Sequence, residues 1–192
     1  MNDFEPLRVA IHSKLACPDV HVGLDKIIDI SLGLVQHLKE TNFPLPVGQP
    51  YSRTVLYRSS EIELMIARWA YASECAPHDH GHAESLIYIL SGSVRHRLYK
   101  IMDGRLQVIR EEHKAQGDCI RCAPFQIHSM APQEPLLTLH VYAPIIEDMY
   151  VYSAKEKLTF RVRGNCGAWI PLDDSRDIFE TFLAHQPRVQ EV

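Results

Sequence analysis

The stretch CAPHDHGHAESLIYILSGS, residues 75–93, places three histidines within five positions, directly before an apolar run and a Ser-Gly turn. On a β-strand, side chains at i and i+2 leave the same face, so His78 and His80 would project together, followed by His82 and Glu84 if the strand continues. Imidazoles at that spacing can bind one metal ion because alternate side chains of a strand are neighbours. A solvated histidine loop, or a partly buried polar turn, is the competing interpretation of these residues taken alone.

The sequence around this stretch is typical of an all-β domain. From Tyr51 to about Arg163, short runs rich in Val, Ile, Leu and Tyr alternate with turn residues. The runs begin with SRTVLYRSS, IELMIARWA, SLIYILSGS and VRHRLYK, and continue with LQVIREEH, GDCIR, FQIHSMAP, LLTLHVYAP and MYVYSAK. About nine strands at a spacing near ten residues predict a sandwich or a barrel.

Both ends of the chain have helical patterns. Residues 4–40 contain apolar side chains at intervals of three and four, namely Leu24, Ile27, Ile28, Leu32, Leu34, Val35 and Leu38. The segment TNFPLPVGQP, residues 41–50, ends this pattern with three prolines and a glycine. The tail DDSRDIFETFLAHQ, residues 173–186, predicts an amphipathic helix with Asp or Ser as its N-cap.

The length of 192 residues suits one domain with a sizeable core. We expect a helical region over residues 1–50, a β-barrel core over 51–163, and a C-terminal extension with a helix over 164–192. The net charge of −4 does not provide the basic surface that nucleic-acid binding requires. No apolar stretch approaches the roughly 20 residues that span a bilayer, and the N-terminal MNDFEPLRVA lacks the features of a secretory signal.

The cysteines and the remaining histidines give weaker signals. The cysteines form an odd, scattered set, which argues against a disulfide framework and for a reducing compartment: Cys17, Cys75, Cys119, Cys122 and Cys166. We therefore expect a soluble cytoplasmic protein, a monomer or a weak homo-oligomer, with no nucleic-acid or membrane partner. The CxxC spacing of Cys119 and Cys122 has no second CxxC beside it, and we interpret it as incidental. His12, His96 and His113 lie on polar or mixed segments, which predicts surface positions.

A further histidine far along the chain strengthens the metal-site interpretation. His128 ends the run GDCIRCAPFQIH, in which a glycine, a proline and a strand precede it. Two histidines on one strand and a third on a later strand that returns to the same cavity resemble the two-motif layout of the cupins. This resemblance predicts a jelly-roll-like β-barrel with the third ligand distant in sequence.

Within the cupins, the sequence resembles the cysteine dioxygenase-type thiol dioxygenases over roughly residues 50–145. The motif HDHG follows Trp69 by nine positions, and Gly92 lies fourteen positions after His78, as in that family. The segment TLHVYAP, residues 138–144, is similar to the family's Ser-Leu-His-x-Tyr-Ser-Pro. The early YSR, residues 51–53, is similar to its Tyr-x-Arg.

The resemblance implies a role for each matching residue. The ligands of an Fe(II) ion would be His78, His80 and His128, three neutral imidazoles that leave the ion its full charge. Arg53 would bind the substrate carboxylate through two parallel hydrogen bonds, and Tyr51 would line the same pocket. For an arbitrary arginine, a structural ion pair is the alternative role.

A second set of residues would lie beside the metal rather than on it. His140 and Tyr142 would form a hydrogen-bonding pair next to the reacting groups, and Thr138 stands where the family usually has a serine. Ser85 occupies the position of a cysteine that the animal enzymes link to the tyrosine, so no thioether can form through Ser85. The resemblance makes a cis Ala143-Pro144 bond plausible without deciding it.

The resemblance implies a dioxygenase whose partners are a small thiol and O2, and whose product is a sulfinate. L-Cysteine is the leading substrate because Arg53 accompanies cysteine preference in the family. The alternatives are another carboxylate-bearing thiol, of the 3-mercaptopropionate or mercaptosuccinate type, and a non-catalytic cupin that binds a small ligand. Glu84 could serve as a fourth ligand in a manganese or nickel cupin, but the other motifs favour a place beside the ligands or at the rim. We place His82 at the cavity mouth.

Overall fold

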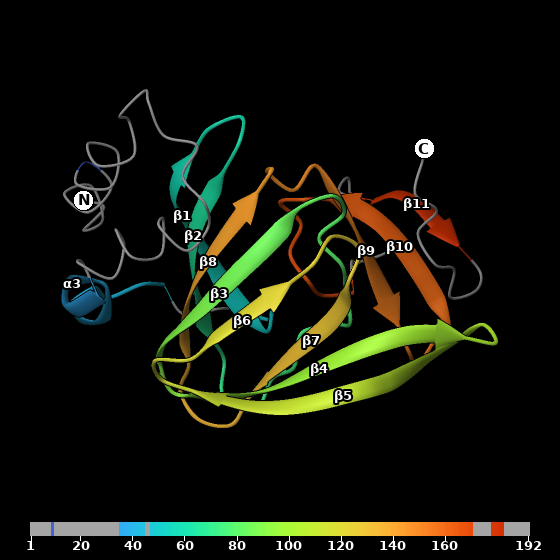
Figure 1. The fold of residues 1–192 in the computed structure, drawn as a ribbon, viewed down its shortest axis with the longest axis horizontal. Helices are drawn as coiled ribbons and strands as arrows, with labels where there is room; N and C mark the ends of the chain where they lie inside the picture. The colour runs from blue at the N-terminus through green and yellow to red at the C-terminus, as the bar shows by residue number, and fades with distance from the viewer. Residues whose placement is uncertain (1–8, 10–34, 45–46, 171–177, 183–192) are drawn as a thin grey trace.

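The computed structural model describes residues 9, 35–44, 47–170 and 178–182 of the chain (Figure 1). One short helix, α3 (Val35–Glu40), precedes the strands in this part. The strands are β1 (Tyr51–Arg58), β2 (Glu63–Trp69), β3 (Glu84–Ser91), β4 (Ser93–Met102), β5 (Arg105–Ala115), β6 (Cys119–Cys122), β7 (Ile127–Pro132), β8 (Leu137–Ala143), β9 (Asp148–Ser153), β10 (Leu158–Arg163) and β11 (Ile178–Phe182).

The strands form three hydrogen-bonded groups. A five-stranded antiparallel sheet has the order β1-β2-β8-β3-β6, and two three-stranded sheets have the orders β5-β4-β7 and β11-β10-β9. His78 makes isolated bridges to His128 on β7 and to Val151 on β9, and so joins the two smaller sheets. The five-stranded sheet and this combined layer lie on opposite sides of the molecule in Figure 1. The result is the all-β, jelly-roll-like barrel that the sequence predicts.

The central strands of the five-stranded sheet, β2, β8 and β3, are largely buried on both faces, and strand alternation separates the two cores. On β2, Met65 and Ala67 point into the barrel, whereas Leu64 and Ile66 pack on the outer face. The outer face is covered by the segment that contains α3, whose Leu38 is fully buried there. On β8 the same alternation sends apolar residues outward and polar ones inward. The sheet can therefore carry a polar line into the barrel without exposing its apolar side chains.

The C-terminal part of the chain differs from the expectation. Residues 178–182 form β11, which pairs antiparallel with β10, so the predicted C-terminal helix is wrong over these residues. β10 was absent from the predicted runs. Pairing with a neighbouring strand decides the conformation of such short segments, because helix and strand patterns are hard to distinguish over five residues.

The predicted N-terminal helical region lies largely outside the described residues, and α3 is the part of it that the structure describes. Ala143-Pro144 is a cis peptide bond. Among the described residues, no helix is long and apolar enough to cross a membrane.

Gly92 is required at the turn between β3 and β4. Its φ is +87°, and a Cβ at this position would overlap the carbonyl oxygen of Pro135. Gly104 also has a positive φ, +65°, but a Cβ there would meet nothing within 4 Å. We predict that Gly104→Ala lowers the free energy of unfolding by about 1 kcal/mol through backbone strain alone. Gly92→Ala should lower it by about 2–4 kcal/mol, because overpacking adds to the strain.

Urea unfolding of both variants and the wild type measures these losses. Equal losses in the two variants would contradict the role of the Pro135 contact.

Candidate metal centre

The backbone brings His78 and His128 together. The N–H of each residue donates to the carbonyl of the other, and both bonds are 2.9 Å long. Residues opposed in this way in an antiparallel pair have Cα atoms about 5.5 Å apart and side chains on one face. The two imidazole rings consequently lie 4.4 Å apart between centroids.

The opposite edge of the same segment is fixed to β9. The N–H of Tyr152 donates to Pro77 at 2.8 Å, and the N–H of Asp79 donates to Tyr150 at 3.1 Å. The fully buried carboxylate of Asp79 accepts hydrogen bonds from the N–H groups of Gly81 and Tyr150 at 2.9 and 3.2 Å. Asp79 thus fixes the turn that follows His80 and directs the His80 side chain back toward the other two histidines.

The three histidines converge through their Nε2 atoms. His80 Nε2 lies 3.2 Å from His78 Nε2 and 3.3 Å from His128 Nε2, and all three rings are buried. Two nitrogens bonded to one ion at about 2.1 Å, with octahedral or tetrahedral angles, are about 3.0–3.4 Å apart. The observed separations fit this donor set. The three residues that the sequence singles out therefore form one candidate metal site.

Hydrogen bonds at the outer nitrogens of His78 and His128 keep the Nε2 lone pairs of these two residues directed inward. His78 Nδ1 lies 2.9 Å from the carbonyl oxygen of Ala76, so it carries the proton and donates it. His128 Nδ1 lies 3.1 Å from Nε2 of His96. Nδ1 of His80 has no hydrogen-bond partner among the described residues. Outer partners of this kind select the tautomer that leaves Nε2 available to a metal.

Burial keeps these imidazoles neutral. It lowers the pKa of His78 from 6.5 to about 4, and it lowers the pKa values of His80 and His128 well below 6.5, with the neighbouring histidines adding to the effect. A neutral imidazole is the form that binds a metal.

A polar line on the inward face of β8 lies beside the three histidines. The indole N–H of Trp69 donates to Thr138 Oγ1 at 2.9 Å, and that hydroxyl lies 2.7 Å from His140 Nε2. His140 Nδ1 lies 3.0 Å from the Tyr142 hydroxyl, whose ring is 5.0 Å from the ring of His80 between centroids. The sequence predicted the Thr138, His140 and Tyr142 grouping, and the structure brings it to the candidate centre.

Arg53 lines the same pocket but already has partners. Its Nη2 donates to Glu63 Oε1 at 3.0 Å, and its Nε donates to the sulfur of Met65 at 3.3 Å. Glu63 is buried and also pairs with Arg58 at 3.1 Å. The structure therefore shows the structural ion pair that the sequence left open as the alternative role of Arg53, and it places Arg53 in the lining of the pocket.

Tyr51 lines the pocket as expected, with its hydroxyl accepting a hydrogen bond from the N–H of Ala168 at 2.8 Å. Its ring packs between Trp69 and Trp169, at centroid distances of 4.5 and 5.5 Å. Burial raises the pKa of the hydroxyl, which stays protonated.

The residues just beyond His80 do not join the ligands. The expected strand through His78 and His80 is reduced to two isolated bridges, both made by His78, and a turn at Gly81 and His82 ends the extended segment. Glu84 is 43% exposed and forms an ion pair with Arg121 at 2.6 Å, which matches the rim position. His82 is also exposed. Ser85 is fully buried and stands opposite Tyr142 in the β3–β8 register.

Two residues near the centre were missed or misplaced by the sequence interpretation. His96 is 3% exposed and contacts His128, so its predicted surface position is wrong. It shares the inward parity of Val94 on β4, and that alternation was the available signal. Cys122 is fully buried with Sγ 3.6 Å from His128 Nδ1, so it belongs to the environment of the centre. His113 is exposed, as expected.

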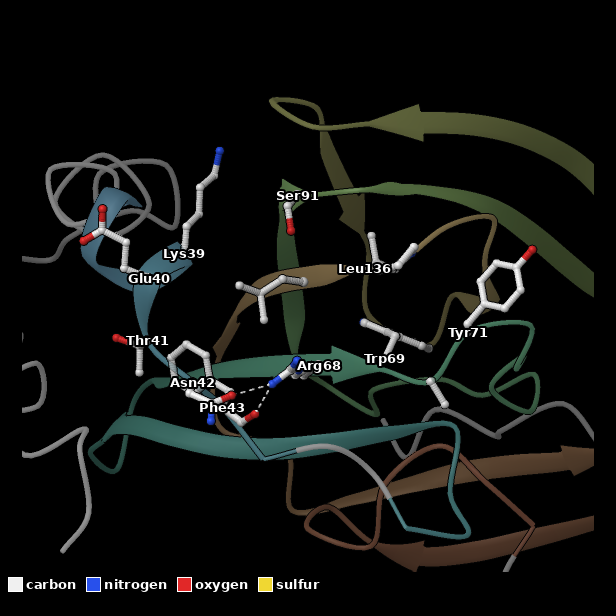
Figure 2. Close-up of a pocket in the computed structure, with 13 residues that line it drawn as sticks. Lys39, Glu40, Thr41, Asn42, Phe43, Arg68, Trp69, Tyr71, Ser91 and Leu136 are labelled. Atoms are coloured by element: carbon white, nitrogen blue, oxygen red, sulfur yellow. Dashed lines mark hydrogen bonds between the residues drawn. The ribbon is translucent and has the colours of Figure 1, made fainter.

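The cavity at the centre is small, about 10 Å³. This is the space of about one water molecule, so a ligand larger than water fits only if side chains move apart. A larger cleft of about 550 Å³ lies elsewhere, between the segment after α3 and the ends of β2, β3 and β8 (Figure 2). Arg68 bridges it by hydrogen bonds to Asn42 and to the carbonyl of Phe43. None of the predicted site residues lines this cleft.

No protein-family model matches the chain. Its structural neighbours are cupin and double-stranded β-helix proteins. KdgF from Halomonas sp. is 16% identical, with a TM-score of 0.45 over 55% of this chain and 90% of that one. An uncharacterised double-stranded β-helix protein from Klebsiella pneumoniae is 20% identical, with a TM-score of 0.43 over 57% and 81%. An RmlC-like cupin from Shewanella frigidimarina is 16% identical, with a TM-score of 0.42 over 55% and 86%. These likenesses concern the fold.

We predict that His128→Ala loses bound metal, because it removes one of three converging nitrogens. His113→Ala removes an exposed histidine and should retain the wild-type metal content. Metal analysis of both variants after loading with Fe(II) under anaerobic conditions measures the difference. A His128→Ala protein that keeps one ion per chain would show that the third ligand is misassigned.

The buried histidines also predict the pH dependence of stability. Burial lowers the pKa values of His78 and His96 to about 4 and that of His140 to about 3. The unfolded chain therefore takes up protons first, so this stability is complete above pH 6.5 and is lost as the pH falls toward 4. With bound metal removed by a chelator, the free energy of unfolding should be lower at pH 5.5 than at pH 7.5 by on the order of 1 kcal/mol for each such histidine. Urea unfolding at both pH values tests this, and an unchanged midpoint would contradict it.

Proposed function

We propose that this protein is a non-haem Fe(II) thiol dioxygenase that converts L-cysteine to cysteine sulfinate. The balanced reaction is R–SH + O2 → R–SO2⁻ + H⁺. Both oxygen atoms form bonds to sulfur, the S–H bond breaks, and its proton leaves to solvent. Sulfur is oxidised and dioxygen is reduced, so no further reductant is needed.

The observation that carries this proposal is the joint arrangement of two groups around one cavity. Three neutral imidazoles with no carboxylate among them face the hydroxyl of Tyr142, which is held by the line through His140 and Thr138. A site that only binds a ligand has no need for a buried tyrosine held by such a line. The combination supports a reaction at sulfur rather than storage or sensing.

A ferrous ion held by His78, His80 and His128 would keep its full +2 charge and supply the site at which a thiol loses its proton and meets dioxygen. The protein's contribution is to hold the donors in place and to position the substrate beside them. Positioning of this kind replaces a collision by an oriented contact.

Tyr142 is suited to donate a hydrogen bond into the cavity. Burial raises its pKa well above 10, so the hydroxyl keeps its proton. When Thr138 donates to His140 Nε2, His140 donates from Nδ1 to the oxygen of Tyr142. The hydrogen of Tyr142 is then directed to the substrate. His140 stays neutral because burial lowers its pKa to about 3.

Arg53 would bind the substrate carboxylate, in competition with Glu63. The guanidinium has five donors, and the contacts with Glu63 and Met65 use two of its nitrogens. Because Glu63 also pairs with Arg58, its negative charge is shared between two guanidinium groups and holds Arg53 less strongly. A carboxylate can therefore approach the remaining donors as the cavity opens.

We predict oxygen consumption by the Fe(II)-loaded protein with L-cysteine, and a product that has gained two oxygen atoms. The same assay with three other thiols separates the alternatives. 3-Mercaptopropionate lacks the amine of cysteine, and mercaptosuccinate lacks the amine and has a second carboxylate. Cysteamine keeps the amine but lacks the carboxylate. Cysteamine should be a poor substrate. Faster turnover of the thiols without an amine would overturn the cysteine assignment, and no uptake with any thiol would overturn the proposal.

The role of Arg53 is tested by substitution. Arg53→Ala should raise KM for L-cysteine about 10- to 100-fold, the value of a lost charge-assisted hydrogen bond. Arg58→Ala is the matched control, because Arg58 also pairs with Glu63 but does not line the cavity. Equal effects of the two substitutions would assign Arg53 to the ion pair alone.

A further inference from the structure

His96 is a buried polar residue that the proposed reaction does not use. It lies on the central strand of the β5-β4-β7 sheet, opposite Glu112 in the β4–β5 register and opposite Met130 in the β4–β7 register. Its Nε2 is 3.1 Å from Nδ1 of the ligand His128, on the side away from the cavity. Its Nδ1 has no hydrogen-bond partner among the described residues, and the nearest carboxylate oxygen, from Glu112, is 3.9 Å away.

The tautomers of the two histidines follow from these contacts. A neutral imidazole has one N–H and one lone pair. If Nε2 of His128 binds a metal, its Nδ1 carries the proton and must donate it. Nε2 of His96 is then the acceptor, so His96 carries its own proton on Nδ1, facing the carboxylate of Glu112. The N–H groups of His128 and His96 thus both point away from the metal, the first toward His96 and the second toward Glu112.

We infer that His96 is a positioning residue that sets the metal affinity and the reduction potential of the centre through His128. An acceptor at Nδ1–H fixes the ring orientation and makes the metal-binding nitrogen a stronger donor. A stronger donor stabilises the oxidised ion more than the reduced one, so the hydrogen bond from His128 to His96 also lowers the reduction potential of the centre. This inference rests on a metal at the three histidines, but not on a thiol as the substrate.

Glu112 contributes less than His96, because its charge is shared. One of its oxygens pairs with Arg110, and the other lies 3.8 Å from Lys114. The field that reaches His96 is correspondingly reduced. The hydrogen bond between the two histidines therefore carries most of the effect.

Cys122 offers a competing use of the same nitrogen. His96, Cys122 and His128 lie close enough to hold an ion of their own, with Cys122 Sγ 3.6 Å from His128 Nδ1. An ion there would need the Nδ1 lone pair, which the tautomer for the first site does not have. Two ions per chain would require His128 to lose both ring protons and bridge them, whereas the tautomer described above gives one ion per chain.

The test compares His96→Met with His96→Gln, two side chains of equal length that differ in their ability to accept a hydrogen bond. Co(II) is titrated into the metal-free protein and followed by its visible absorption, and the potential of the Fe-loaded protein is measured by redox titration. His96→Met should raise the Kd for Co(II) about 10- to 100-fold and raise the potential. His96→Gln should restore both toward the wild type, because its amide oxygen accepts the hydrogen bond.

Glu112→Gln, at a partly exposed position, should raise the Kd about two- to fivefold. It keeps the inference testable if His96→Met does not fold. His113→Phe, on the same strand as Glu112 but exposed, is the control and should leave Kd unchanged.

Three results would overturn the inference. The first is a folded His96→Met protein with the wild-type Kd and potential. The second is an unchanged Kd in Glu112→Gln when His96→Met cannot be prepared. The third is binding of two Co(II) ions per chain, one of which His96→Met loses. If the variants differ in Kd for Co(II) as expected but the Fe(II)-loaded wild type consumes no oxygen with any thiol, the result counts against the thiol reaction alone.

Discussion

The centre depends on the pair of backbone hydrogen bonds between His78 and His128. These bonds make two residues that are distant in sequence direct neighbours, with both imidazoles on one face. They also attach the segment before β3 to β7, while the next bonds along the segment attach it to β9. Sheet pairing therefore sets the positions of His78 and His128, and the turn fixed by Asp79 adds His80.

The interior of the barrel tolerates many polar groups because most of them are paired with one another. Thr138, His140 and Tyr142 point inward from a strand whose other face is apolar, and Trp69 completes their line of hydrogen bonds. Buried polar groups are costly without partners and specific when they have them. Here the same pairing that avoids this cost also fixes which atoms face the cavity, so stability and chemistry make the same demand on the sequence.

The barrel core and the grouping of the three candidate metal ligands could be predicted from sequence, because strand alternation and motif spacing are local signals. Two predictions needed no knowledge of distant contacts. One used the spacing of His78, His80 and Gly92, and the other used the shared parity of Thr138, His140 and Tyr142. β11 could not be predicted, since its five residues fit either pattern until they pair with β10.

The burial of His96 had one local signal, its shared parity with Val94, but the charged neighbours Arg95 and Arg97 on β4 obscured it. Its place follows from the packing of β7 beside it. The ion pair of Arg53 with Glu63 likewise depends on the β1–β2 register and not on the Tyr-x-Arg motif.

The bridging role of His78 has a consequence for the folding equilibrium. The segment that supplies two of the ligands is also the seam between the two smaller sheets. An ion that binds across this seam binds the folded chain and not the unfolded one, so each tenfold excess of ion over its Kd adds about 1.4 kcal/mol to stability. Metal supply would then govern how much of the chain persists as intact barrel, in addition to how much of it is active.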